Sequence, residues 1–190
     1  MDLSGEYTIP AGRERVWQAL NDPAILQQCI AGCENLDKNS DTEFSAKVTA
    51  KVGPVKATFA GSVVLSDIDA PNGYTISGEG QGGVAGFAKG SAQVKLADSG
   101  DGGTVLTYEA KADVGGKLAS IGSRLVAGVA KKTADDFFGK FSEIVGEGAE
   151  DAEPAPKEGA PEAENPSLPP AVWVGGLVVV VGLLLYFFAT

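Results

Sequence analysis

Histidine is absent from this chain of 190 residues, and cysteine occurs only twice. Without histidine, the usual His/Cys zinc sites and the Ser–His or Cys–His nucleophile pairs cannot be assembled. Cys29 and Cys33 are separated by three residues, and we interpret them as small thiols in a reducing compartment, where structural disulfides are rare. We therefore expect no metal site and no covalently bound cofactor.

Positive charge is also scarce, with 15 Lys and Arg against 25 Asp and Glu, a net charge of −10. Nucleic-acid binding needs a cationic surface that neutralises phosphates, so we exclude it. One basic strip is the exception. We interpret it either as a solvated helix face or as a contact for anionic headgroups or an acidic partner, and it consists of Lys117, Arg124, Lys131 and Lys132.

Residues 171–189 form an uncharged run of valine, leucine, glycine and aromatic residues. At about 1.5 Å of rise per residue, such a helix approaches the ~30 Å hydrocarbon core of a bilayer. The first residues, Met1 to Glu6, have neither a basic region nor an apolar core, so no secretory signal is predicted. We expect a single-pass C-terminal transmembrane anchor over 171–190 in the cytoplasmic membrane, with the preceding domain facing the cytoplasm.

Residues 147–170 read EGAEDAEPAPKEGAPEAENPSLPP, a composition too polar and proline-rich to bury much surface. We predict a disordered acidic linker that could span up to roughly 75 Å at ~3.1 Å per residue. It is either an inert spacer or a tether that lets the domain move between the bilayer and a partner.

Residues 1–146 remain as one domain of ordinary size. Apolar residues at helical spacing predict two short helices, and alternation of apolar and polar residues predicts strands. The expected helices are Gly12–Asn21 and Pro23–Ile30, and the expected strands are Leu3–Ile9, Glu43–Val52, Val55–Leu65, Tyr74–Gln81, Val84–Ala97 and Thr104–Val114.

Beyond Gly116 the period of apolar residues changes to three or four, which predicts one long amphipathic helix from Leu118 to Ile144. The order is therefore strand, two helices, a run of antiparallel strands and a long C-terminal helix. We predict an α+β helix-grip fold, in which a curved antiparallel sheet wraps around the last helix.

The inward face of this sheet is unusually small. Interiors pack at a density of ~0.75, so a sheet facing a helix needs large side chains to close the gap. Either the glycines mark bends and close approach of the helix, or the face lines a ligand cavity. The small inward residues are Ala46, Ala50, Ala57, Gly61, Gly78, Gly80, Gly86, Ala88, Gly90, Ala92, Ala110 and Ala112.

We favour the cavity, because small residues recur on four successive strands. Its only inward polar groups are the hydroxyls of Tyr74 and Tyr108, and we take Tyr108 as the donor to a ligand carbonyl. The glycine-rich run before Phe87 is not interpreted as a nucleotide-binding loop, because no helix follows it to cradle a phosphate. We expect it instead to form a hairpin with Phe87 near its tip, and this hairpin would gate the cavity. The expected walls are Ala50, Phe59, Ile76, Gly78, Tyr108 and Ala110 on the sheet, and Leu118, Ile121, Gly122, Leu125 and Val129 on the helix.

No inward pair of carboxylates and no histidine is available for general acid–base chemistry, so we expect binding and not catalysis. A flat apolar ring with a carbonyl or two and an isoprenoid tail would match the lining. A membrane anchor would hold the cavity near such lipids.

Five ordered motifs stand out in the first part of the chain. They are Cys29-Ile30-Ala31-Gly32-Cys33-Glu34, Val52-Gly53-Pro54-Val55, Gly90-Ser91-Ala92, Gly103-Thr104-x-Leu106-x-Tyr108, and Val114-Gly115-Gly116-Lys117-Leu118-Ala119 through Phe137-Phe138. Together they resemble the CoxG family, the G subunit of carbon monoxide dehydrogenase, which belongs to the START-like, SRPBCC helix-grip superfamily. The resemblance covers residues 1–146.

The resemblance implies a non-catalytic, membrane-anchored accessory protein of a molybdenum hydroxylase of the carbon monoxide dehydrogenase type. It further implies that the cavity binds a respiratory quinone, menaquinone or ubiquinone, and that the protein couples or recruits the enzyme to membrane electron transport. The alternatives are a recruitment adaptor that binds no ligand, a START-like enzyme and a general lipid carrier.

Overall fold

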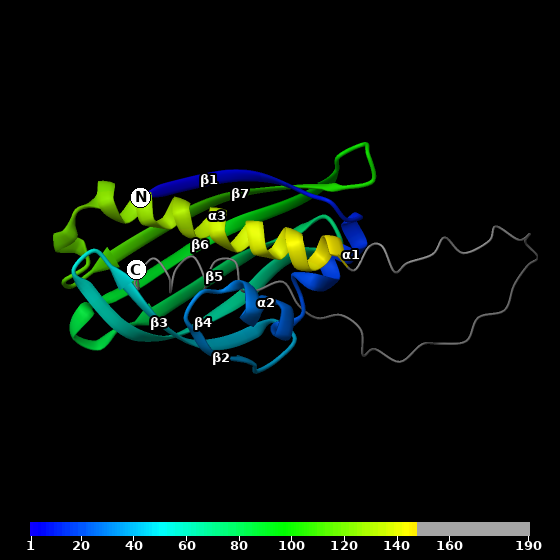
Figure 1. Cartoon of the computed structure of the whole chain (residues 1–190). Coiled ribbons are helices and arrows are strands. Elements are labelled where there is room, and N and C mark those ends of the chain that lie inside the picture. Colours follow the sequence, from blue (N-terminus) through cyan, green and yellow to red (C-terminus); the bar gives the residue numbers. More distant parts are fainter. Residues whose placement is uncertain (148–190) are drawn as a thin grey trace, which may run out of the picture.

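One antiparallel sheet curves around a long helix in the computed structural model, which describes residues 1–147 (Figure 1). The predicted anchor and all of the predicted linker except Glu147 lie outside the described residues. Among residues 1–147, no helix is long and apolar enough to span a bilayer. The elements are β1 (Asp2–Ile9), α1 (Arg13–Ala19), α2 (Pro23–Cys29), β2 (Cys33–Lys38), β3 (Glu43–Val52), β4 (Val55–Asp69), β5 (Gly73–Gln81), η1 (Gly83–Ala85), β6 (Phe87–Asp98), β7 (Thr104–Gly115), η2 (Ala119–Ile121) and α3 (Ser123–Glu147).

The strands lie in the order β1-β7-β6-β5-β4-β3-β2. Strands β2 to β7 pair with their neighbours in the chain, whereas β1 pairs with the last strand, β7. Helices α1 and α2 therefore connect the two edges of the sheet, and α3 lies across its concave face (Figure 1). This is the helix-grip arrangement that the sequence predicts.

Local chemistry explains where the elements begin and turn. Helix α2 begins at Pro23, and the side chain of Asp22 caps it by accepting a hydrogen bond from the Ala24 backbone N–H at 2.8 Å. The turn between β3 and β4 passes through Gly53, whose φ of 55° is costly for other residues. Pro54 follows it, as the sequence predicts.

The long helix begins later than its apolar pattern suggests. Leu118 precedes a single 3₁₀ turn, and Gly122 at φ 99° separates this turn from α3. A residue at that φ ends regular helical geometry, so α3 starts at Ser123 and not near Leu118. The helix face buried in the core consists of Val126, Ala130, Thr133, Ala134, Phe137, Phe138, Phe141 and Val145.

Two strand predictions also need correction. β2 was not predicted, because Leu36 is its only buried residue and charged side chains surround it. The strand expected from Val84 begins at Phe87, since Gly82 to Gly86 form a 3₁₀ turn with positive φ at Gly83 and Gly86. The other predicted strands match β1, β3, β5 and β7 closely, and β4 continues four residues past the predicted end at Leu65.

Candidate functional site

Small residues do line the concave face of the sheet, and they gather in one half of it. The register places Gly78 of β5 opposite Gly90 of β6, which lies opposite Ala112 of β7. In the other half, the same strands present large side chains to the core. The buried or half-buried residues of the small half are Ala46, Ala57, Gly61, Gly78, Gly80, Ala88, Gly90, Ala92, Ala110 and Ala112, and those of the large half include Phe44, Leu65, Tyr74, Ile76, Val94, Leu96, Leu106 and Tyr108.

The buried face of α3 has the same division. Val126, Ala130 and Ala134 come first along the helix and are at most 1% exposed. Phe137, Phe138 and Phe141 follow, and their rings pack together at centroid distances of 5.1 and 5.9 Å. Small residues of the helix thus lie toward the small half of the sheet, and the aromatic rings fill the end near α1 and α2.

At some glycines of the inner face, a neighbouring side chain occupies the space that a Cβ would take. A Cβ on Gly78 would clash with the side chain of Val63, and one on Gly5 would lie 2.6 Å from the ring of Tyr108. A Cβ on Gly82 would clash with the ring of Phe59. At these three positions close packing explains the glycine. Val63 and Phe59 thus fill part of the small half of the interior.

The hydroxyl of Tyr74 is the unusual polar group of the interior. Tyr74 is 2% exposed, its ring packs against Trp17 at 5.4 Å, and its oxygen has no hydrogen-bond partner among the described residues. Burial raises the pKa of this phenol, so it stays protonated and remains a donor. A buried hydroxyl without a partner costs about 1–3 kcal/mol, which makes this group a candidate ligand contact.

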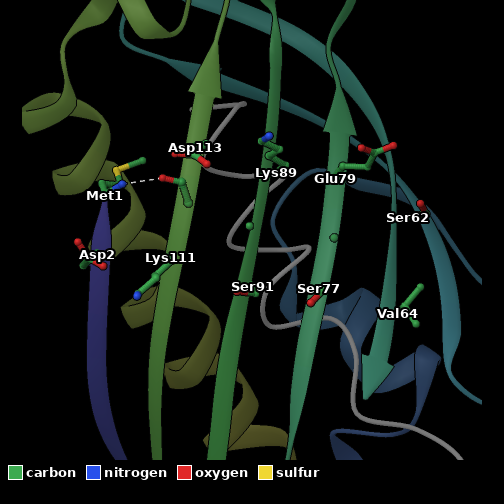
Figure 2. Close-up of a pocket in the computed structure, with 13 residues that line it drawn as sticks. Met1, Asp2, Ser62, Val64, Ser77, Glu79, Lys89, Ser91, Lys111 and Asp113 are labelled. Atoms are coloured by element: carbon green, nitrogen blue, oxygen red, sulfur yellow. Dashed lines mark hydrogen bonds between the residues drawn. The ribbon is translucent and has the colours of Figure 1, made fainter. Parts of the chain in front are cut away.

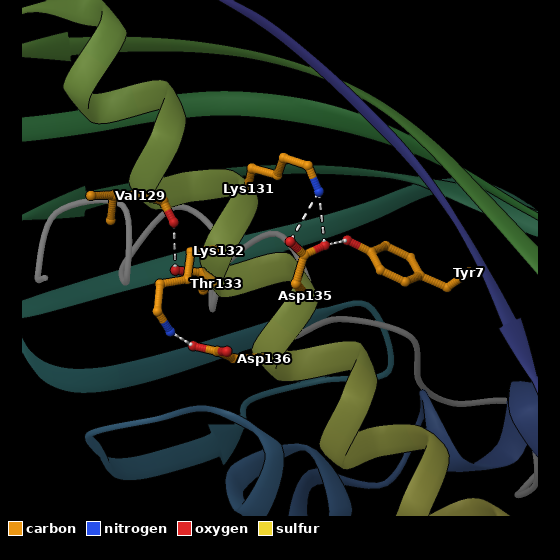
Figure 3. Close-up of polar contacts among 7 residues, drawn as sticks. All are labelled: Tyr7, Val129, Lys131, Lys132, Thr133, Asp135 and Asp136. Atoms are coloured by element: carbon orange, nitrogen blue, oxygen red, sulfur yellow. Dashed lines mark hydrogen bonds and ion pairs between the residues drawn. The ribbon is translucent and has the colours of Figure 1, made fainter.

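Tyr108, the predicted donor, lies in a different setting. It is 5% exposed and stacks with Tyr7 and Phe138, and burial raises the pKa of its phenol. The hydroxyl of Tyr7 donates to Asp135 of α3 at 2.8 Å (Figure 3). Burial and this hydrogen bond raise the pKa of Tyr7, so the edge strand β1 is tied to the helix by a protonated phenol.

The other predicted wall residues divide into two groups. Phe59, Ile76 and Leu118 are at most 1% exposed, and Gly78, Ala110, Ile121 and Val129 are half-buried around the same core. Ala50 lies on β3 opposite Ala57.

Three residues are not brought to the inner face. Leu125 is 48% exposed and contacts the β3–β4 turn, and Gly122 has open space around its Cα. Phe87 is 40% exposed and lies opposite Gln81 and Gly115 in the register, on the outer face of the sheet. The inner helix residues that the sequence analysis missed, Val126 and Ala130, lie one position after Leu125 and Val129 in the same apolar pattern.

Two members of the predicted basic strip are neutralised locally. Lys131 pairs with Asp135 at 2.9 Å and Lys132 pairs with Asp136, each one helical turn along α3 (Figure 3). The hydrogen bond from Lys131 lowers the pKa of the Asp135 carboxyl. Lys117 and Arg124 form no ion pair with any residue of 1–147, so the net positive charge lies near the start of α3.

A hollow of about 650 Å³ lies on the outer face of the sheet, across β1, β7, β6, β5 and β4 (Figure 2). Its floor consists of serines and of the backbone at Gly78 and Gly90, and charges of both signs surround it. The sequence analysis missed this hollow, although the outward serines were visible in the alternation. Its polar lining residues are Asp2, Ser62, Ser77, Glu79, Lys89, Ser91, Lys111 and Asp113.

Residues 1–147 contain no group of three or more His, Cys, Asp or Glu side chains that could hold a metal ion. Burial raises the pKa of the Cys29 thiol to about 11, and it also raises that of Cys33. Both thiols are therefore protonated near neutral pH and poorly nucleophilic.

Solved structures share this fold. A conserved protein from Geobacillus kaustophilus is 33% identical, with a TM-score of 0.73 over 77% of this chain and 96% of that one. TTHA0849 from Thermus thermophilus is 15% identical (TM-score 0.57, 76% and 97% covered), and the Zhui aromatase/cyclase from a Streptomyces species is 12% identical (TM-score 0.53, 76% and 93% covered). The last two show the fold alone.

Among curated proteins, none matches this chain. The sequence of residues 5–146, which spans nearly all of the described domain, matches the family described as CoxG, the G subunit of carbon monoxide dehydrogenase. With its helix-grip fold and a 33% identical relative covered almost end to end, the chain belongs to the CoxG family.

Proposed function

We propose that this protein is a membrane-anchored accessory subunit that binds a respiratory quinone, menaquinone or ubiquinone, inside its helix-grip domain. In this role it couples a molybdenum hydroxylase of the carbon monoxide dehydrogenase type to electron transport at the cytoplasmic membrane. Membership of the CoxG family, which is named for a subunit of carbon monoxide dehydrogenase, supports the accessory role. The uncharged run over residues 171–189 supports the anchor.

The hydroxyl of Tyr74 carries the ligand proposal. It is a protonated donor without a partner in residues 1–147, on a side chain that is only 2% exposed. A quinone carbonyl is a pure acceptor on a flat apolar ring, so it would satisfy this hydroxyl and bury the ring at once. Tyr74 therefore replaces Tyr108 as the proposed donor.

The gradient of side-chain size supports an orientation for the ligand. Tyr74 is the second residue of β5, and Gly78 and Gly80 follow it on the same inward face. At about 3.3 Å per residue, six residues of strand correspond to roughly 20 Å. A ring held at Tyr74 would lead its isoprenoid tail along the small half of the sheet toward Val126 and Ala130, where the helix and the sheet must separate slightly to admit it.

The residues of the interior can hold and orient such a guest, but its buried phenols offer no general base near neutral pH. The chain has no histidine, and its buried phenols keep their protons. The domain would exclude water from the ring and leave the redox chemistry to the enzyme and the respiratory chain.

The test is extraction of lipid from the full chain, purified in mild detergent from a quinone-producing host, and identification by mass spectrometry. We expect about one quinone per chain, strongly reduced in Tyr74→Phe and retained in Tyr7→Phe, which removes a hydroxyl that has its own partner. A wild-type protein free of quinone, or equal retention in both variants, would contradict the proposal.

A filling variant tests the path of the tail. Gly78→Leu is unsuitable because its side chain would meet Val63, so we choose Ala110→Leu on the inner face. Ser91→Leu on the outer face is the matched control. Loss of quinone in the first variant only, with both proteins folded, is the expected result.

The outer hollow favours a second candidate function. Glu79, Lys89 and Asp113 lie side by side in register across β5, β6 and β7 and alternate in charge (Figure 2). Such a surface suits a polar protein contact, and an adaptor could recruit the hydroxylase through it without any ligand. A quinone-free protein that still binds the enzyme, and loses it on Lys89→Glu, would favour this function.

A further inference from the structure

Exposed apolar side chains gather at one end of the domain. This end, which we name the basic end, consists of the connecting segments 51–56, 81–87 and 114–125 (Figure 1). The three segments contact one another: Gly53 lies against Leu125, and the backbone N–H of Leu118 donates to the carbonyl oxygen of Ala85 at 3.2 Å. Val84 is 84% exposed, Leu125 48% and Phe87 40%.

The charge of this end has one sign. Its three segments contain four exposed basic residues, Lys51, Lys56, Lys117 and Arg124, and no acidic residue. The turns at the opposite end, 39–42, 66–72 and 98–103, contain five aspartates and no Lys or Arg. Arg13 of α1 pairs with Asp98 at 3.3 Å and offsets one of these charges. With the other four aspartates at this end, the domain is polarised along its length although the chain is acidic overall.

We propose that the basic end is the surface by which the domain docks on an anionic lipid bilayer. Apolar tips surrounded by basic residues match the interface of such a bilayer, where the side chains of Val84 and Leu125 would enter the headgroup region and the ammonium and guanidinium groups would meet phosphates. Each basic residue near an anionic surface raises the partition constant roughly fivefold. The acidic turns at the opposite end would point away from the membrane.

The length of chain outside the described residues permits this orientation. Helix α3 has 25 residues and is about 37 Å long at ~1.5 Å per residue, and it runs from the basic end to Glu147 at the other end. Residues 148–170 would have to return over that distance to reach the predicted anchor. Their extended reach of about 70 Å at ~3.1 Å per residue exceeds it.

Docking in this pose does not depend on quinone, although it rests on the proposed membrane location. It also differs from the basic strip expected on α3, because Lys131 and Lys132 are paired and Lys51 and Lys56 replace them. The signal in the sequence was the lack of any acidic residue between Glu43 and Asp67 and between Asp113 and Asp135.

The test uses the full chain in nanodiscs of synthetic, quinone-free lipid, with either phosphatidylcholine alone or about 30% phosphatidylglycerol added. Hydrogen exchange is measured for segments 82–87 and 119–125. We expect exchange to slow at least about fivefold on the anionic discs relative to the neutral ones, and the protection to weaken at about 0.5 M NaCl.

Two pairs of variants sharpen the result. Reversing Lys51, Lys56, Lys117 and Arg124 to Glu should abolish the protection, whereas the control reversal of Lys89, Lys95, Lys111 and Lys140, which are exposed elsewhere, should keep it. Val84→Ser with Leu125→Ser should weaken it, and the control Val64→Ser with Ile68→Ser should not.

Equal exchange on both kinds of disc, or equal loss in test and control variants, would overturn the proposal. Protection that arises only on addition of the hydroxylase would also overturn it and assign this end to a protein partner. Since the discs contain no quinone, none of these outcomes depends on whether Tyr74 binds one.

Discussion

Replacement of Tyr74 by phenylalanine is the most direct probe of the interior. The substitution removes one oxygen and keeps the ring that packs against Trp17. Most deletions of a buried polar group destabilise a protein because they break a hydrogen bond, but this hydroxyl has no partner among residues 1–147. The quinone-free protein should therefore become more stable.

The size of the effect follows from the burial of the group. An unsatisfied buried hydroxyl costs about 1–3 kcal/mol, and the small void left behind offsets part of the gain. We expect a net increase of about 1–2 kcal/mol in the free energy of unfolding. For a domain of this length, that increase corresponds to a rise of roughly 3–6 °C in Tm.

Quinone should narrow the difference in stability between the two proteins. A hydrogen bond to the carbonyl contributes about 0.5–1.5 kcal/mol, so Tyr74→Phe should weaken quinone binding roughly 2- to 12-fold. Wild-type protein would then gain more stability from saturating ligand than the variant does.

The assay is thermal and denaturant unfolding of the full chain in detergent, first stripped of lipid and then loaded with a short-chain quinone. Tyr7→Phe is the matched control, and it should lose about 1 kcal/mol because its hydroxyl donates to Asp135. If stripped Tyr74→Phe is also destabilised, the hydroxyl has a partner in the native protein. If its quinone affinity equals that of the wild type, no carbonyl accepts from it.

Three further results are expected. Gly78→Ala should lower the free energy of unfolding by about 1–3 kcal/mol in chemical denaturation because its Cβ meets Val63, whereas Gly128→Ala, with open space, should not lower it. Burial and the hydrogen bond to Asp135 raise the folded-state pKa of Tyr7, so the stabilisation by its hydroxyl is present below pH ~10 and is lost as the pH rises further. The difference in free energy of unfolding between wild type and Tyr7→Phe should therefore shrink above pH ~10. A difference that stays constant would refute this. A maleimide at pH ~8 should modify half-buried Cys33 before buried Cys29, whose thiol pKa is raised to about 11. Peptide mapping gives the order of modification. The reverse order would show that α2 opens readily.

Much of the fold follows from periodicity in the sequence. The alternation along Glu43–Val52 and Val55–Leu65 correctly predicts which side chains face the core, since Phe44, Val48 and Phe59 are buried. The turn at Gly53-Pro54 then fixes the register of the pair. A one-residue slip would expose this whole apolar face, so the pattern determines the pairing.

The start of the last helix could not be read in the same way. Leu118, Ile121, Leu125 and Val129 have helical spacing, but Gly122 at positive φ separates Leu118 and Ile121 from α3. The buried stripe therefore runs through Val126 and Ala130, one residue later. A helical period gives the width of an apolar stripe, but tertiary contacts such as that of Leu125 with Gly53 decide which edge of the stripe is buried.

The choice between two candidate donors is a case that the sequence alone could not decide. Tyr74 and Tyr108 have the same side chain and the same inward parity, so the sequence offers no reason to prefer one. Only packing separates them, because Tyr108 lies against Tyr7 and Gly5, whereas the oxygen of Tyr74 is buried without a hydrogen-bond partner among residues 1–147.

Gly78 and Gly90 face the core on one side and form the floor of the outer hollow on the other. With no side chain at either position, the sheet itself is there one peptide group thick, and on the inner side the side chain of Val63 lies against Gly78. A protein resting in the hollow would press on these peptide planes and, through them, on the side chain of Val63. If the proposed quinone lies in the core, it and the docking partner would then act on each other through the sheet itself, without a hinge between them.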